Sequence, residues 1–193
     1  NCCFNTKKNW PHGLTTTMKR EIRDKFKEKR LFLSSEDVRD TSDKIIAKLA
    51  EVDRVWKAKS IMFYYPINKE VDLIPLMKNF LKNKKVLLPR IIENELVPFV
   101  VEDFEKVVLG KYNVLEPDTY KFEEEIDVVI VPGVAFNKKG WRIGMGKGYY
   151  DKYLKDKKCV KIGVCFDFQI TDKVYEEEHD VKMDLIVTEK GVK

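Results

Sequence analysis

The chain has 193 residues, of which 44% are hydrophobic and 36% are charged, and its formal net charge is +5. This composition is typical of a globular domain with its own core, and it excludes an intrinsically disordered chain. No apolar run approaches the ~20 residues of a membrane-spanning helix, so we expect no membrane partner. The mild basic excess suits binding of an anionic small molecule. The sequence has no dense basic block with interleaved aromatic residues, so we expect no nucleic-acid partner.

Cysteine and histidine are scarce, and their spacing gives no metal-binding motif. Four cysteines and two histidines occur, at Cys2, Cys3, Cys159 and Cys165 and at His12 and His179. No pair has CxxC spacing, so we expect no structural zinc site, and the pattern suits a reducing compartment. We therefore expect a cytoplasmic protein, with an organelle as the alternative if the first residues are the remnant of a targeting segment.

The first 17 residues, Asn1 to Thr17, differ from the rest because they contain no acidic residue and show no periodicity. We interpret them as a flexible leader: a processed end, an expression remnant or a natural tail. Residues 18–193 are predicted to form a single α/β domain.

Two helices are expected at the start of that domain. Met18, Ile22 and Phe26 recur at four-residue spacing, which predicts a helix from Met18 with a basic stripe beside its apolar face. A second helix is expected from Ser35 to Asp53, where Ser34 and Asp37 resemble a capping box.

Strand-like and helix-like segments then alternate along the chain. Short apolar runs predict strands at Ser60–Tyr65, Val86–Pro89, Ile126–Pro132, Val160–Phe166 and Leu185–Thr188. Helices are expected at Leu73–Leu81 and Tyr149–Lys155, and the less regular segments Glu95–Val101 and Lys106–Tyr112 are expected to be a strand and a loop. This alternation predicts an α/β fold: a mainly parallel sheet flanked by helices in an open three-layer arrangement.

Four glycines lie within nine residues, between the most apolar predicted strand and the next predicted helix: Gly140, Gly144, Gly146 and Gly148. In open α/β sheets ligands bind at such strand–helix junctions, and closely spaced glycines let backbone N–H groups converge on an anion. Arg142 and Lys147 add positive charge, so the segment is interpreted as a phosphate cradle. It matches neither the Walker A pattern nor GxGxxG, and a turn that only redirects the chain remains the alternative.

The run from Arg142 to Asp151, RIGMGKGYYD, closely resembles the signature of the 5-formyltetrahydrofolate cyclo-ligase family. The resemblance extends over nearly everything from Met18 onward. Weaker pieces occur in the family's order: the basic start at Lys19–Arg23, Tyr64-Tyr65-Pro66 followed by Glu70-Val71-Asp72, Pro89-Arg90, Val131-Pro132-Gly133, and Asp184–Glu189.

The resemblance implies an enzyme that converts 5-formyltetrahydrofolate to 5,10-methenyltetrahydrofolate with ATP as co-substrate and Mg²⁺, releasing ADP and phosphate. A phosphorylated formyl group would be the intermediate. Small molecules would be its partners, and we expect a monomer or weak dimer.

The resemblance also implies roles for individual residues. Catalysis would fall to Arg142 and Lys147, and Mg²⁺ would bind Asp151. ATP would bind Lys19, Arg20, Arg23, Arg142, Ile143, Gly144, Met145, Gly146, Lys147, Gly148, Tyr149 and Tyr150. The folate would bind Tyr64, Tyr65, Glu70, Trp141 and Tyr149.

Simpler interpretations of these residues stay open. Lys19 and Arg23 alone suggest a solvated basic helix face, Asp151 suggests a first-turn acid, and Glu70 suggests a loop acid. Strand alternation implies that only one of Tyr64 and Tyr65 faces the folate. The residues also leave open whether Asp184 assists the metal or caps a strand, and the acidic run Glu176-Glu177-Glu178 is expected to be a solvated loop.

Rival functions from other classes are a sugar-phosphate isomerase or CoA-transferase-like enzyme on a related scaffold, and a nonenzymatic nucleotide-binding module. A requirement for ATP in turnover separates them.

Overall fold

A central sheet organises the fold in the computed structural model, which describes residues 12–110 and 114–193. Its strand order is β11-β10-β9-β6-β1-β2-β3. The five inner strands are parallel, and the strands at the two edges pair antiparallel with their neighbours. The inner strands are β10 (Leu185–Thr188), β9 (Val160–Val164), β6 (Val128–Pro132), β1 (Ser60–Met62) and β2 (Lys85–Ile92), and the edges are β11 (Gly191–Val192) and β3 (Glu95–Val100).

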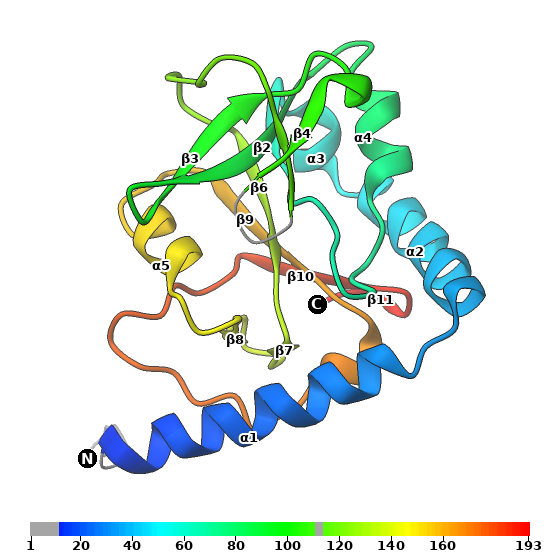
Figure 1. The fold of residues 1–193 in the computed structure, drawn as a ribbon. Coiled ribbons are helices and arrows are strands. Elements are labelled where there is room, and N and C mark those ends of the chain that lie inside the picture. Colours follow the sequence, from blue (N-terminus) through cyan, green and yellow to red (C-terminus); the bar gives the residue numbers. More distant parts are fainter. Residues whose placement is uncertain (1–11, 111–113) are drawn as a thin grey trace, which may run out of the picture.

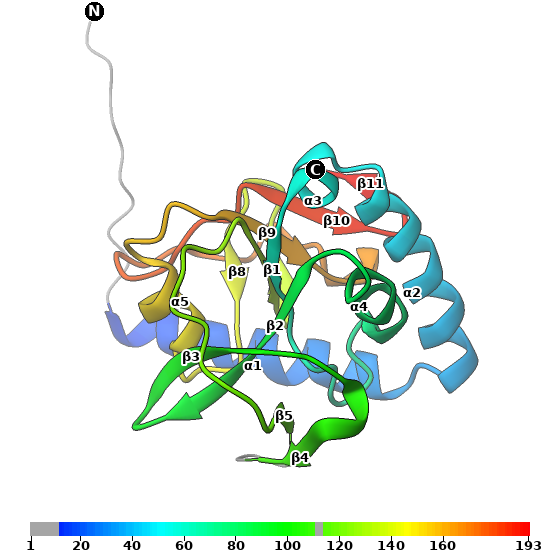
Figure 2. The ribbon, with the colours of Figure 1, turned by 90° about the horizontal axis from the view of Figure 1, so that it is seen from above.

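Both faces of this sheet are buried. Along β1 and β6, successive apolar side chains enter opposite cores: Ile61 and Ile130 one core, and Met62 and Val129 the other. The first core is covered by α2 (Ser35–Ala50), α3 (Asp53–Lys57) and α4 (Ile74–Phe80), and the second by α5 (Tyr149–Leu154) (Figures 1 and 2). The predicted α/β fold, a mainly parallel sheet between helices, is therefore confirmed.

The long helix α1 (His12–Leu31) lies across the carboxyl ends of the parallel strands, beneath the small hairpin β7–β8 (Figure 1). The hairpin consists of β7 (Ala135–Phe136) and β8 (Arg142–Ile143) and follows the carboxyl end of β6. Ile22 and Phe26 of α1 pack against Ala135 and Ile143 in a third apolar cluster. This packing places one face of α1 beside residues 140–148, which we call the Gly-rich segment.

Element boundaries differ from the sequence prediction in several places. α1 begins at His12 rather than at the predicted Met18. The prediction missed the first turns because the glycine and threonines in them have low helix propensity. The remainder of the predicted leader, residues 1–11, lies outside the described residues. The predicted second helix ends at Ala50 and α3 follows it, although buried Leu49, Val52 and Val55 continue the apolar pattern through the break. The capping box of Ser34 and Asp37 is confirmed.

The segment expected to be a loop after β3 contains β4 (Val107–Leu109), which pairs with β5 (Leu115–Pro117). Short 3-10 helices span Phe104–Lys106 and Asp167–Gln169. Within the described ranges, no helix combines the length and the apolar character needed to cross a bilayer.

Candidate active site

A cavity of about 720 Å³ opens at the carboxyl ends of the parallel strands. Its walls come from α1, the segments that follow β1 and β6, the Gly-rich segment, and the stretch around residues 177–180. The walls that follow β1, β6 and β9 come together because parallel strands release their following loops at one edge of the sheet, and α1 packs across that edge (Figure 1). Every residue from Arg142 to Asp151 lines the cavity, so the predicted phosphate cradle lies on one wall.

The backbone of the Gly-rich segment is held in conformations that favour glycine. Gly146 and Gly148 have φ angles of 100° and 68°, in the left-handed region where a Cβ atom is strained. Gly148 is the N-cap of α5, so the segment ends at the start of that helix, whose first residues, Tyr149–Asp151, also line the cavity.

Arg142 is buried beneath this segment, with 6% of its surface exposed. It donates from one terminal nitrogen to the Asp151 carboxylate at 3.0 Å, and its guanidinium lies 5.6 Å from the centre of the Tyr150 ring. The Nε–H of Arg142 has no hydrogen-bond partner among the described residues. Because buried N–H groups are nearly always paired, this unpaired donor in a residue of the cavity wall makes Arg142 a candidate contact for an anionic ligand.

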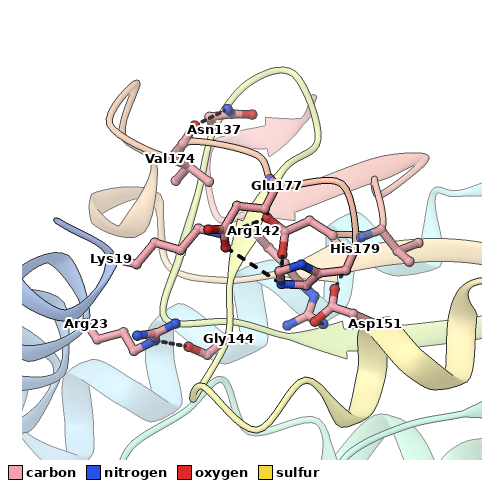
Figure 3. Close-up of polar contacts among 11 residues, drawn as sticks. Lys19, Arg23, Asn137, Arg142, Gly144, Asp151, Val174, Glu177 and His179 are labelled. Carbon is pink, nitrogen blue, oxygen red and sulfur yellow. Dashed lines mark hydrogen bonds and ion pairs between the residues drawn. The ribbon is translucent and has the colours of Figure 1, made fainter. Parts of the chain in front are cut away.

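Two cations of α1 reach the same wall (Figure 3). Arg23 donates through Nε to the Gly144 carbonyl at 2.8 Å. Lys19 is buried, and its Nζ lies 2.6 Å from Glu177 and 2.7 Å from Asp180. The prediction of a solvated acidic run is therefore wrong for Glu177, because Lys19 draws that carboxylate into the cavity wall.

Acidic side chains gather in one part of the cavity wall. Glu177, His179 and Asp180 each offer a ligand atom within 4.8 Å of the others, and Asp151 lies on the neighbouring wall. Mg²⁺ takes carboxylate oxygens together with phosphate oxygens, so the donor chemistry of these acids fits that ion. Asp151 also accepts from the Val181 N–H at 3.3 Å, which fixes its orientation.

Another part of the cavity wall, after β1, carries the residues assigned to folate. Tyr64 and Tyr65 both line the cavity, so strand alternation does not separate them; β1 has ended at Met62. Tyr64 is buried and donates from its hydroxyl to the Val71 carbonyl at 2.9 Å, whereas Tyr65 is half-buried. Glu70 accepts from the Ile67 N–H at 3.2 Å, and burial raises the pKa of its carboxyl above the usual value.

Two predicted contacts do not line the cavity. Arg20 is exposed, because it follows Lys19 by one position and neighbouring helix residues do not share a face. Trp141 packs against the cluster formed by α1 and the hairpin, since it precedes Arg142 in an extended segment and so faces the other side. Asp184 also lies away from the cavity and accepts from the Lys161 N–H at 2.7 Å, as a strand cap would.

Sequence reasoning also missed residues that the fold brings to the site. Glu116 lines the cavity and pairs with Arg90 at 3.2 Å, and the buried Arg30 contacts Glu70. Neither lies in a motif, and their partners are 26 and 40 positions away, so no local pattern marks them.

Comparisons relate this chain to a protein family and to solved structures. A model described as the 5-formyltetrahydrofolate cyclo-ligase family matches residues 15–189. A 5-formyltetrahydrofolate cyclo-ligase of Mycoplasma pneumoniae is 31% identical over 177 residues, which cover 89% of this chain and 99% of that protein. One from Mus musculus is 28% identical, covering 89% and 93%. The solved structure of Aquifex aeolicus 5,10-methenyltetrahydrofolate synthetase is 38% identical, with a TM-score of 0.83 over 91% of this chain and 92% of that one.

Proposed function

This chain belongs to the 5-formyltetrahydrofolate cyclo-ligase family, and on that premise we propose that it closes 5-formyltetrahydrofolate to 5,10-methenyltetrahydrofolate at the expense of ATP. The proposal includes a phosphorylated formyl group as intermediate and Mg²⁺ as the metal. ATP would occupy the wall formed by the Gly-rich segment and α1, and the folate would occupy the wall with Tyr65 and Glu70.

The chemistry requires that a poor leaving group be activated. The formyl oxygen attacks the γ-phosphorus of ATP, the bond to the bridging oxygen breaks, and ADP leaves. The second folate nitrogen then attacks the formyl carbon and loses its proton, and the former formyl oxygen departs with phosphate. Both steps need alignment and charge neutralisation rather than a strong base, which agrees with the scarcity of histidine.

Arg142, Lys147, Lys19 and Arg23 supply the positive charge in this proposal. The observation that supports the proposal best is the unpaired Nε–H of Arg142. This donor is buried, and the ion pair between a terminal nitrogen of the same guanidinium and Asp151 fixes its orientation. Such a group stabilises charge that develops on a transferring phosphoryl oxygen without first having to reorganise. Lys19, now held by two carboxylates, would turn toward the nucleotide phosphates.

The metal site is proposed at Asp151, with Glu177 and Asp180 as neighbouring carboxylates. Mg²⁺ would neutralise phosphate charge when bound there. In the part of the wall after β1, the Glu70 carboxylate would accept hydrogen bonds from the amine and amide groups of the pterin ring.

The deciding experiment incubates the protein with 5-formyltetrahydrofolate and MgATP and follows the absorbance of methenyltetrahydrofolate. We expect one ADP per methenyl product, and no product when either nucleotide or divalent cation is omitted. Full-rate product formation without nucleotide would contradict the proposal, as would nucleotide binding without turnover.

A further inference from the structure

The end of α1 and the turn before Glu70 hold each other by reciprocal hydrogen bonds. Arg30 of α1 donates through Nε to the Asn68 carbonyl at 2.9 Å. In the other direction, Lys69 donates from Nζ to the Leu31 carbonyl at 2.6 Å and also to the carbonyl of Leu33. Lys69 thereby satisfies carbonyls at the end of the helix, where a cation is favourable.

The turn needs such support because of its backbone. Asn68 and Lys69 have φ angles of 48° and 57°, in the left-handed region that residues other than glycine seldom adopt. Glu70 follows directly and lines the cavity. The orientation of this carboxylate therefore depends on the contacts that keep the turn in place.

Arg30 contacts the carboxylate itself as well as the turn. One terminal nitrogen lies 3.4 Å from Glu70 Oε1, and only 2% of the Arg30 side chain and 9% of the Glu70 side chain are exposed. Arg30 does not line the cavity. A buried guanidinium is costly unless it is paired, so both of its contacts are strongly preferred.

From this geometry we infer that Arg30 is a positioning residue for folate recognition, which acts through Glu70 and the turn before it without touching the substrate. The inference rests on the proposed function, because that proposal assigns Glu70 to the folate. It adds a residue from the far end of the helix whose earlier turns carry Lys19 and Arg23.

Electrostatics gives Arg30 a second effect on Glu70. Burial raises the pKa of Glu70, and the charge of Arg30 and the Ile67 N–H lower it. Two tyrosines face this carboxylate from other elements, Tyr64 after β1 and Tyr150 of α5. Burial and, second to it, the charge of Glu70 raise the pKa of both tyrosines, so they stay neutral at physiological pH. Without the charge of Arg30 the pKa of Glu70 rises further, and its ionised form is lost at a higher pH.

The test compares Arg30→Met with Lys69→Met, which removes the other half of the reciprocal contact but no contact to Glu70. The first measurement is the titration of Glu70 by ¹³C NMR of carboxyl-labelled protein, with the signal assigned by Glu70→Gln. We expect its pKa to rise in Arg30→Met and to stay near the wild-type value in Lys69→Met. An unchanged Glu70 titration in folded Arg30→Met overturns the inference.

The second measurement is the pH profile of kcat/KM for 5-formyltetrahydrofolate. On the acid side of this profile, kcat/KM falls as Glu70 becomes protonated. In Arg30→Met this fall, the acid limb, should begin at higher pH, and at pH values below it kcat/KM should be about tenfold lower for each pH unit by which the limb has moved. The Kd of a nonhydrolysable ATP analogue, measured without folate, should not change. An equal fall in folate and ATP use, with no displaced limb, would show a merely structural role and overturn the inference.

Arg30→Lys keeps the test decisive if Arg30→Met fails to fold. Lysine keeps the charge but cannot bridge Asn68 and Glu70 as a planar guanidinium does, so the folate KM should rise while the acid limb moves little. A wild-type folate KM in Arg30→Lys overturns the positioning role. Unchanged folate use in Glu70→Gln would instead overturn the folate placement of the proposed function.

Discussion

Arg142 and Lys147 carry the same charge in the same segment, but the protein holds them differently. Arg142 is buried, bonded to Asp151 and stacked near Tyr150, whereas Lys147 is exposed at the edge of the cavity. The sequence shows both cations between glycines and therefore predicts both as phosphate contacts. It does not show which is preoriented, because that depends on a carboxylate nine positions away.

Lys147→Ala should reduce turnover by about 10²–10³-fold, the usual cost of losing one group that stabilises transition-state charge. Stability should hardly change, because the side chain is exposed. The matched control is Lys155→Ala, an exposed lysine outside the cavity lining, for which we expect wild-type kcat. Steady-state kinetics and urea unfolding test both variants, and near-normal turnover in Lys147→Ala would exclude the lysine from phosphoryl transfer.

Arg142→Ala should cost stability as well as turnover. It leaves the Asp151 carboxylate, whose side chain is 15% exposed, without its guanidinium partner, which should cost roughly 1–3 kcal/mol in free energy of unfolding. Arg142→Lys should restore part of the stability but little of the turnover, because lysine lacks the planar arrangement of donors. If Arg142→Lys matched the wild-type kcat, only the charge would matter, and the assigned role of the Nε–H would be wrong.

At the scale of elements, the apolar pattern predicted the order of strands and helices. Helices that bury one face show a four-residue spacing, and parallel strands that are buried on both faces appear as short continuous apolar runs. The strands Leu185–Thr188 and Glu95–Val100 and the start of α5 at Tyr149 were found within one residue. Periodicity failed where burial continues through a change of structure, as between α2 and α3. It also failed for β4, β5, β7 and β8, which have two or three residues each and are too short to show a period.

Phe26→Ala tests whether α1 must be docked to complete the site. Phe26 is 8% exposed and packs against the β7–β8 hairpin, so its truncation should cost about 3 kcal/mol in free energy of unfolding. The KM for ATP should rise, since Lys19 and Arg23 lie on the loosened helix. Phe32→Ala is the matched control: that ring is 81% exposed, and its loss should cost about 0.5 kcal/mol or less. Equal ATP KM values for the two variants, measured well below their Tm, would contradict a docking role for α1.

At the scale of the whole molecule, the site exists only when distant segments meet. Lys19 meets Glu177 across 158 positions, and Arg23 meets Gly144 across 121. Resemblance to a family supplied Lys19, Arg23 and Gly144 but not Glu177, which was expected in a solvated loop. The pairing of these residues follows from the fold. Because α1 spans the cavity, one rigid element touches the Gly-rich wall through Arg23 and the turn before Glu70 through Arg30.

This shared helix leads us to expect coupling between the two substrates. A ligand that fixes α1 at the Gly-rich wall spares the second ligand part of the cost of ordering the turn before Glu70. A nonhydrolysable ATP analogue should therefore tighten 5-formyltetrahydrofolate binding by about 5- to 10-fold, and the folate should tighten nucleotide binding by the same factor. Calorimetric Kd values, measured in both orders of addition, test the size and the reciprocity of the effect.

Direct contact between the two ligands would also give coupling, and Phe26→Ala separates the two causes. Phe26 does not line the cavity, so its truncation leaves any contact between ligands intact while it loosens α1. We expect the coupling factor to fall toward one in Phe26→Ala and to stay at the wild-type value in Phe32→Ala. A factor unchanged in Phe26→Ala would mean that the ligands communicate across the cavity, because a helix that has lost its anchoring ring would then have no part in the effect.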